Sequence, residues 1–268
     1  MEAVCRRAEK AERVRTRNMY RPVIARKKSG VPVLSRKEID EIGRRLVWDF
    51  MPGALEVPQE IDIDSFAQNY LGMGQDFQYL SHCGVYLGMT VFHDTNKVPV
   101  YDPQRECADY ISAKAHTVII DRTLLADSQE HRYRFTMGHE AGHEFLHKEY
   151  FDYALCRRGV SGHAGKTPEG AVQCRIDMKG LAAKRPETWR DRDWMEWQAN
   201  AFSSAILMPV PMVRKVAEGV RKRGARTVFA GCAAAEVSRV FNVSFEAASY
   251  RLMQLGYIPQ GILYGQHC

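Results

Sequence analysis

The stretch HEAGHEFLH, residues 139–147, contains the pattern H-E-x-x-H twice, because the central His143 belongs to both copies. The first copy runs from His139 to His143, and the second runs from His143 to His147. An α-helix has about 3.6 residues per turn, so the two histidines of either copy lie one turn apart on one face. Their imidazoles can converge there on one ion, and each copy therefore predicts a zinc site on a helix.

The residues between the histidines favour the first copy. Ala141 and Gly142 separate its histidines and Gly138 precedes it, so a second helix can approach this face closely. In the second copy Phe145 and Leu146 take the equivalent places and would hold such a helix away. We therefore place the ion at the first copy, and we expect the last histidine of the stretch to lie behind the site or on the surface.

Glu140 is the predicted catalytic residue. It is rotated by about 100° from His139 around the helix axis, so it can hydrogen-bond a water on the metal instead of binding the metal itself. Zinc lowers the pKa of such a water toward about 7. A carboxylate can then take the proton during attack on a peptide carbonyl and pass it to the leaving amine.

A catalytic zinc needs a third protein ligand and one open position. The segment WMEWQANAFSSAILM, residues 194–208, is apolar almost all round and predicts a buried helix. Glu196 on this helix requires a partner, because an unpaired buried charge is costly, and it is the predicted third ligand. Asn200 lies one turn later on the same face, where we expect it to hydrogen-bond the back of a ligand imidazole.

The remaining pattern predicts an α+β fold with a small antiparallel sheet. Short runs rich in β-branched and aromatic residues predict strands at 85–92, 98–101 and 117–121. Apolar spacing and capping signals predict helices at about 36–50, 64–71, 129–150, 194–208, 212–222, 233–241 and 245–255. The first of these helices begins with a capping box formed by Ser35 and Glu38.

We divide the chain into a basic arm at 1–30, a metal-binding core at 31–210 and a C-terminal helical subdomain at 211–268. Within the core, residues 156–193 form a long polar segment with several glycines and prolines, which predicts a loop or insertion.

The excess of positive over negative charge is confined to the arm. Residues 1–30 hold ten Lys or Arg and three Asp or Glu, whereas the other 238 residues hold 28 basic and 29 acidic side chains. Such an arm can bind nucleic acid or an acidic partner, or it can be a solvated, partly helical leader. The core has no basic excess, which argues against DNA binding as its main activity.

The composition, with 45% hydrophobic and 26% charged residues, is that of a globular chain. No apolar run approaches the roughly 18 residues of a membrane span, and no apolar segment typical of a secretory signal is found, so we predict a cytoplasmic protein. The seven cysteines form no C-x-x-C pair, which indicates reduced thiols. The spacing of Cys156, His163 and Cys174 matches no standard zinc pattern.

The last two predicted helices, in AAAEVSRVFNVSFEAASYRLMQLGYI, have the apolar spacing of a helix-turn-helix. A DNA-binding interpretation needs exposed basic residues on the second helix, and Arg251 is the only one there. We therefore favour a packing or partner-docking role for this pair.

The chain resembles the ImmA/IrrE family of zinc metallopeptidases in two motifs, RFTMGHEAGHEFLH and WMEWQANAFSSAILMP. The resemblance covers about residues 31–258. It implies a zincin-like core with a gluzincin-like site in which His139 and His143 bind zinc. Glu140 is then the general base and Glu196 the third ligand. The family also implies specific cleavage of a helix-turn-helix repressor that controls a mobile element or a stress response. The alternatives are a non-proteolytic zincin-like regulator that binds protein or DNA, and a stress sensor controlled by its zinc state.

Two further roles of a zinc peptidase have candidates in the sequence. His163, Tyr150 and Tyr153 could donate a hydrogen bond to the oxyanion, although each can equally be an ordinary loop or surface residue. Exposed backbone at 98–101 could align a substrate peptide by strand addition.

Overall fold

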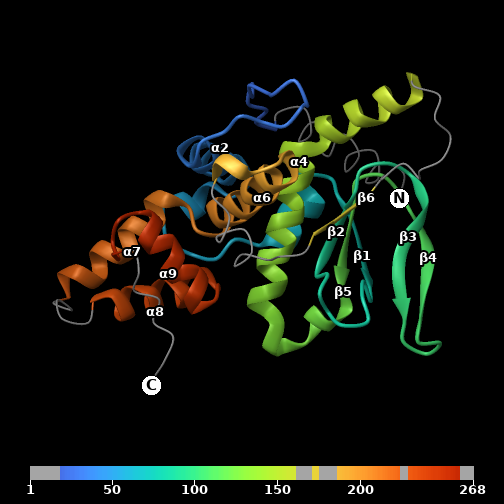
Figure 1. Cartoon of the computed structure of the whole chain (residues 1–268). Coiled ribbons are helices and arrows are strands. Elements are labelled where there is room, and N and C mark those ends of the chain that lie inside the picture. The colour runs from blue at the N-terminus through green and yellow to red at the C-terminus, as the bar shows by residue number, and fades with distance from the viewer. Residues whose placement is uncertain (1–18, 161–170, 175–185, 224–228, 260–268) are drawn as a thin grey trace, which may run out of the picture.

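Figure 1 shows the computed structural model, which describes residues 19–160, 171–174, 186–223 and 229–259. This part of the chain contains helices and small sheets, which confirms the predicted α+β class. Residues 1–18 of the predicted basic arm lie outside the described ranges.

In the described part of the chain, the larger sheet has four strands in the order β1-β5-β2-β6. They are β1 (Gly74–Gln78), β2 (Gly88–Val91), β5 (Thr117–Asp121) and β6 (Ala171–Cys174). β2 runs antiparallel to β5 and β6, but β1 runs parallel to β5, so the prediction of a purely antiparallel sheet is wrong. The sequence of β1, GQDFQ, is mostly polar and gives no signal of apolar alternation.

A separate antiparallel pair is formed by β3 (Thr95–Asp102) and β4 (Cys107–Ala113). The segment 98–101 was predicted as a strand of the main sheet, and the structure corrects this prediction. Val98 and Val100 are buried in one apolar cluster with Met89 and Val91 of β2. The burial of these valines holds the β3–β4 pair against the larger sheet, and the pair does not add strands to that sheet.

The helices and helical turns are α2 (Arg36–Phe50), η1 (Pro52–Leu55), α3 (Ile63–Ser65), η2 (Phe66–Tyr70), η3 (Arg122–Leu125), η4 (Asp127–Gln129), α4 (Glu130–Val160), η5 (Pro186–Thr188), α6 (Asp191–Leu207), α7 (Val210–Lys222), α8 (Phe229–Phe241) and α9 (Phe245–Gln254). The predicted capping box of α2 is present, since Ser35 N–H donates to Glu38 Oε2 at 2.7 Å and Glu38 N–H donates to Ser35 Oγ at 3.3 Å. α4 lies between the larger sheet and α6, and α2 packs on α6 (Figure 1).

Small residues let α6 approach α4, as predicted. A methyl group on Gly138 would lie 2.6 Å from Ser203 Oγ. A methyl group on Gly142 would lie 3.1 Å from Cβ of Phe202 and 3.2 Å from Cα of Ala199. Larger side chains would force the two helices apart, so these glycines bring the side chains of α6 within reach of the histidines on α4.

The long polar segment predicted at 156–193 contains more regular structure than expected. α4 continues to Val160, β6 occupies 171–174, and α6 begins at Asp191. The early start of α6 has a local cause, because the Asp193 carboxylate accepts a hydrogen bond from the backbone N–H of Arg190 at 2.9 Å. Acidic residues in a first helical turn also interact favourably with the helix dipole.

The C-terminal helices pack together at the end of the molecule away from the sheet (Figure 1). Arg251 of α9, the one basic residue available for a DNA-binding second helix, is 1% exposed. Its Nε and Nη2 atoms donate to the carbonyl oxygen of Met208 at 3.1 and 3.0 Å, and Nη2 lies 2.7 Å from Asp40 Oδ1. Arg251 therefore joins α9 to the end of α6 and to α2, and it does not face solvent.

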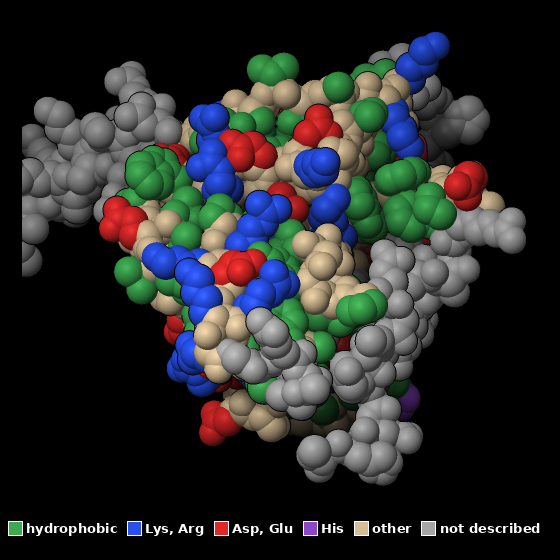
Figure 2. Space-filling view, turned by 90° about the vertical axis from the view of Figure 1, so that its left-hand side faces the viewer, with side chains coloured by type: hydrophobic (Ala, Val, Ile, Leu, Met, Phe, Trp, Pro, Cys, Tyr) green, Lys and Arg blue, Asp and Glu red, His purple; other side chains and the backbone are tan. Residues whose placement is uncertain are grey.

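The face formed by this end of the molecule carries Lys and Arg side chains with Asp and Glu between them (Figure 2). Glu236 lies 3.1 Å from Arg239 and 3.8 Å from Arg223, and Glu218 lies 3.6 Å from Arg221. The positive charges of these arginines are thus partly balanced by neighbouring carboxylates.

Among the residues that the structure describes, no helix combines the length and the apolar character that a membrane span requires. Cys83, Cys107 and Cys232 are free and exposed, which fits reduced thiols. The side chains of Cys156, His163 and Cys174 lie outside the described part, so the structure does not test a cluster of these residues.

Candidate metal centre

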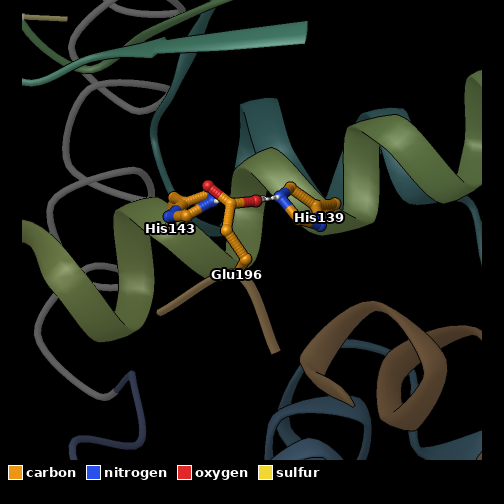
Figure 3. Close-up of side chains that lie close together, drawn as sticks. All are labelled: His139, His143 and Glu196. Atoms are coloured by element: carbon orange, nitrogen blue, oxygen red, sulfur yellow. Dashed lines mark hydrogen bonds and ion pairs between the residues drawn. The ribbon is translucent and has the colours of Figure 1, made fainter. Parts of the chain in front are cut away.

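Three predicted ligands converge between α4 and α6. Figure 3 shows the Glu196 carboxylate of α6 lying between the imidazoles of His139 and His143 on α4. The two Nε2 atoms are 2.9 Å apart, and Glu196 Oε2 lies 3.4 Å from Nε2 of His139 and 3.8 Å from Nε2 of His143. These three residues form a group that could hold a metal ion.

The spacing of the three donor atoms fits a tetrahedral ion. Metal–ligand bonds of about 2.0–2.1 Å at the tetrahedral angle place donor atoms about 3.3–3.4 Å apart. The measured separations of 2.9, 3.4 and 3.8 Å lie on both sides of this value. Two imidazole nitrogens and one carboxylate oxygen are also a donor set that catalytic zinc sites use, with a fourth position left for water or substrate.

Burial and charge prepare the group for a cation. The imidazoles of His139 and His143 are 0% and 1% exposed, whereas the Glu196 side chain is 17% exposed. Burial alone would raise the pKa of Glu196, but the hydrogen bonds and charges of the two histidines hold it well below its usual range. Burial acts to lower the pKa of His139, and the hydrogen bond and charge of Glu196 reverse this effect and raise it. The group therefore contains an ionised carboxylate in a largely dry setting.

Asn200 contacts the back of the His139 imidazole, as predicted. Its Oδ1 atom lies 2.9 Å from His139 Nδ1, and both residues are buried. An amide oxygen accepts, so His139 Nδ1 donates the hydrogen bond and the lone pair lies on Nε2, toward His143 and Glu196.

Glu140 is fully buried next to the group, against strand β2. Its Oε2 atom accepts a hydrogen bond from Thr90 Oγ1 at 2.6 Å, whereas Oε1 has no hydrogen-bond partner among the described residues. Burial raises the pKa of Glu140, while the charges of His139 and His143 and the Thr90 hydrogen bond act to lower it. A carboxylate with a raised pKa is better matched to accept and return a proton near neutral pH.

Gly88 of β2 makes room for the Glu140 side chain. A methyl group at Gly88 would lie 2.6 Å from Glu140 Oε1 and 2.8 Å from Cγ2 of Thr136. Neither Gly88 nor Thr90 was predicted as a site residue. A glycine inside a predicted strand is a signal of close approach, and it could have pointed to Gly88. Thr90 gave no comparable signal, because it is an ordinary strand residue in the sequence.

The second H-E-x-x-H copy has a different environment. Glu144 Oε1 lies 2.6 Å from His116 Nδ1, and Glu144 does not belong to the three-residue group. His147 is fully buried behind His143, with their Nδ1 atoms 3.0 Å apart. Of the two places predicted for His147, behind the site or on the surface, the structure shows the first. Burial and the charge of His143 lower the pKa of His147 well below its ordinary value.

Two of the three candidates for the oxyanion donor, Tyr150 and Tyr153, lie away from the group along α4. Tyr150 and Tyr153 lie seven and ten residues after His143 on α4, which is about 10 and 15 Å along the helix axis. Tyr153 is 47% exposed, and His163 lies outside the described part. The oxyanion role of these residues stays a prediction.

A comparison with family models gives a match over residues 180–253, to Peptidase_M78, described as the IrrE N-terminal-like domain. The match includes Glu196 and Asn200 and begins after the helix that carries His139 and His143. No curated protein matches the chain significantly. The family model confirms the resemblance to the ImmA/IrrE family that the two sequence motifs indicated.

Proposed function

We propose that this protein is a zinc-dependent endopeptidase. The observation that supports this proposal is the convergence of His139, His143 and Glu196 beside a buried Glu140, whose Oε1 atom has no hydrogen-bond partner among the described residues. The match to a peptidase family over the helix that carries Glu196 gives independent support.

A zinc ion held by these three residues would polarise the scissile carbonyl and lower the pKa of a water toward about 7. Glu140 then has the role of proton carrier. Its Oε2 atom is occupied by Thr90, so Oε1 is the atom that takes the proton of the attacking water and gives it to the leaving amine. Full burial of Glu140 keeps bulk water from competing for this proton transfer.

We further propose that the substrate is a specific protein, a helix-turn-helix transcriptional repressor of a mobile element or a stress response. This part rests on the resemblance to the ImmA/IrrE family. The buried Arg251 supports a proteolytic role over a regulator that binds DNA through α9, because α9 presents no basic residue to a phosphate backbone.

Matched variants of the two H-E-x-x-H copies test this function. Glu140→Gln should keep about one zinc per chain and abolish cleavage of a repressor encoded by a neighbouring gene. Glu144→Gln makes the same chemical change in the second copy and should leave cleavage active. Glu196→Ala should lose the zinc. A fully functional Glu140→Gln variant would contradict the proposal and favour the non-proteolytic regulator.

A further inference from the structure

We propose that His147 and Gln198, with the carbonyl of Pro32, form a hydrogen-bonded chain that fixes the tautomer and the ring orientation of His143. His147 and Gln198 are thus positioning residues for the metal centre, and this inference rests on the proposed zinc site. It also assigns a use to the second H-E-x-x-H copy, whose last histidine does not bind the metal.

The chain begins at a backbone carbonyl, which fixes the direction of every hydrogen bond after it. Gln198 Nε2 lies 2.8 Å from the carbonyl oxygen of Pro32. A carbonyl oxygen can only accept, so the amide nitrogen of Gln198 must face Pro32 and the amide oxygen must face away from it. That oxygen lies 2.9 Å from His147 Nε2 and also can only accept, so His147 Nε2 carries a proton.

The next hydrogen bond determines which nitrogen of His143 carries the proton. A neutral imidazole has one N–H group, so with its proton on Nε2 His147 has a lone pair on Nδ1. This atom faces His143 Nδ1 at 3.0 Å, and two lone pairs at that distance would repel each other. His143 Nδ1 must therefore donate, which leaves the lone pair of His143 on Nε2, toward His139 and Glu196. The lone pairs of His139 and His143 then face each other across 2.9 Å, and a cation bound by both Nε2 atoms would remove their repulsion.

The reverse arrangement is incompatible with metal binding. If His147 donated from both nitrogens, His143 Nδ1 would have to accept, and a neutral His143 would then carry its proton on Nε2. That proton would point at His139 Nε2, 2.9 Å away, and would occupy the position of the ion. The direction in which Gln198 and His147 donate is thus the direction that a bound cation requires.

Both imidazoles of the group are therefore oriented from α6 by an amide side chain. Asn200 Oδ1 accepts directly from His139 Nδ1 at 2.9 Å. Gln198 contacts His147 instead, and His147 in turn contacts His143. Gln198 and His147 are 1% and 0% exposed, so water does not compete with these hydrogen bonds.

The segment that supplies Pro32 is itself fixed to α4. Arg26 Nη1 donates to the carbonyl oxygens of Leu146, at 3.0 Å, and Gly30, at 3.1 Å. Lys27 N–H donates to Val31 O at 2.8 Å, and the Val31 side chain is fully buried. The start of the hydrogen-bonded chain is therefore held next to the turn of α4 that carries His147.

Nitrogen-15 NMR of the histidine side chains tests the proton positions directly. In the full-length metal-free protein, His147 should show the pattern of a neutral ring with its proton on Nε2. In the zinc-loaded protein, His143 should keep a proton on Nδ1. A His147 ring with its proton on Nδ1, or a ring that carries two protons at neutral pH, would overturn the proposal.

Zinc affinity, measured by competition with a chelator, tests the consequence. His147→Phe removes the acceptor for His143 Nδ1 and should weaken zinc binding about 10- to 100-fold, the usual effect of losing a residue that orients a ligand. His147→Gln supplies an amide acceptor at the same helix position and should recover most of the affinity. Gln198→Met removes the acceptor for His147 Nε2 and the donor to the Pro32 carbonyl, so it should also weaken zinc binding.

His131→Phe is the matched control, since His131 is an exposed histidine of α4 that contacts Asn242. It should bind zinc as tightly as the parent. A His147→Phe variant that also binds zinc within twofold of the parent would overturn this inference and leave the proposed function intact. A parent protein that binds no zinc would overturn both.

Discussion

At the scale of single residues, the two carboxylate oxygens of Glu140 differ in their hydrogen bonding. Oε2 is held by Thr90 at 2.6 Å, and Oε1 is buried without a partner in the described part of the chain. A base that keeps one oxygen fixed and one free presents its proton acceptor in a defined direction, which reduces the reorganisation needed during proton transfer.

Thr90→Val tests this arrangement, because valine keeps the volume and removes the hydroxyl. The hydrogen bond from Thr90 favours the ionised carboxylate and lowers its pKa, so its loss should raise the pKa of Glu140. A general base acts in its ionised form, and the acidic limb of kcat/KM against pH should therefore move to higher pH. Thr90→Ser retains the hydroxyl and should keep the parent profile. An acidic limb that stays in place, or moves to lower pH, would argue against this role of Thr90.

The sequence reveals the candidate ligands more readily than the residues that orient them. His139, His143 and Glu196 could be predicted because helical spacing and the cost of a buried charge are local properties. Gln198 could not, since its role depends on Pro32, which is 166 residues away in sequence and 2.8 Å away in space. His147 could be placed near the site, but its use as an acceptor depends on which atom of Gln198 faces it.

At the scale of elements, the site depends on how closely α4 and α6 approach. Both helices follow from apolar spacing and from the glycines of the first copy, and the structure confirms both. The sheet was less predictable. β1 is mostly polar, and β3 pairs with β4 outside the main sheet, with Val98 and Val100 buried against β2. Strand pairing of this kind is decided by tertiary contacts that short sequence windows do not contain.

Gly142→Ala tests the helix contact. Alanine has the higher helix propensity, by about 1 kcal/mol, but the added methyl would meet Phe202 at 3.1 Å and the backbone of Ala199 at 3.2 Å. We expect overpacking to dominate, with a loss of about 1–3 kcal/mol in the free energy of unfolding and weaker zinc binding as Glu196 moves away. Gly231→Ala on α8 adds the same methyl where nothing lies within 4 Å, and it should stabilise the protein. A more stable Gly142→Ala variant with unchanged zinc affinity would contradict the close contact.

At the scale of the whole molecule, Arg251 connects the C-terminal helices to the part of the chain that carries the candidate metal centre. It reaches Met208 at the end of α6 and Asp40 on α2, and α6 also carries Glu196. The helix pair that resembles a helix-turn-helix in sequence therefore packs against the core through the residue that a DNA-binding function would expose.

Arg251→Met should destabilise the protein by about 3–5 kcal/mol in urea unfolding, because it leaves Asp40 without its buried partner. Arg239→Met is the control on α8. Its side chain is 71% exposed and its ion pair with Glu236 is solvated, so the free energy of unfolding should stay close to that of the parent. Equal effects of the two substitutions would show that Arg251 does not join the helices as described.

The central claim is that the first H-E-x-x-H copy and Glu196 together bind one metal ion. The most direct test is X-ray diffraction at the zinc absorption edge from crystals grown with one equivalent of zinc. The anomalous map should show a single peak between Nε2 of His139, Nε2 of His143 and a carboxylate oxygen of Glu196. A peak between His143 and His147, or no peak at Glu196, would contradict the account.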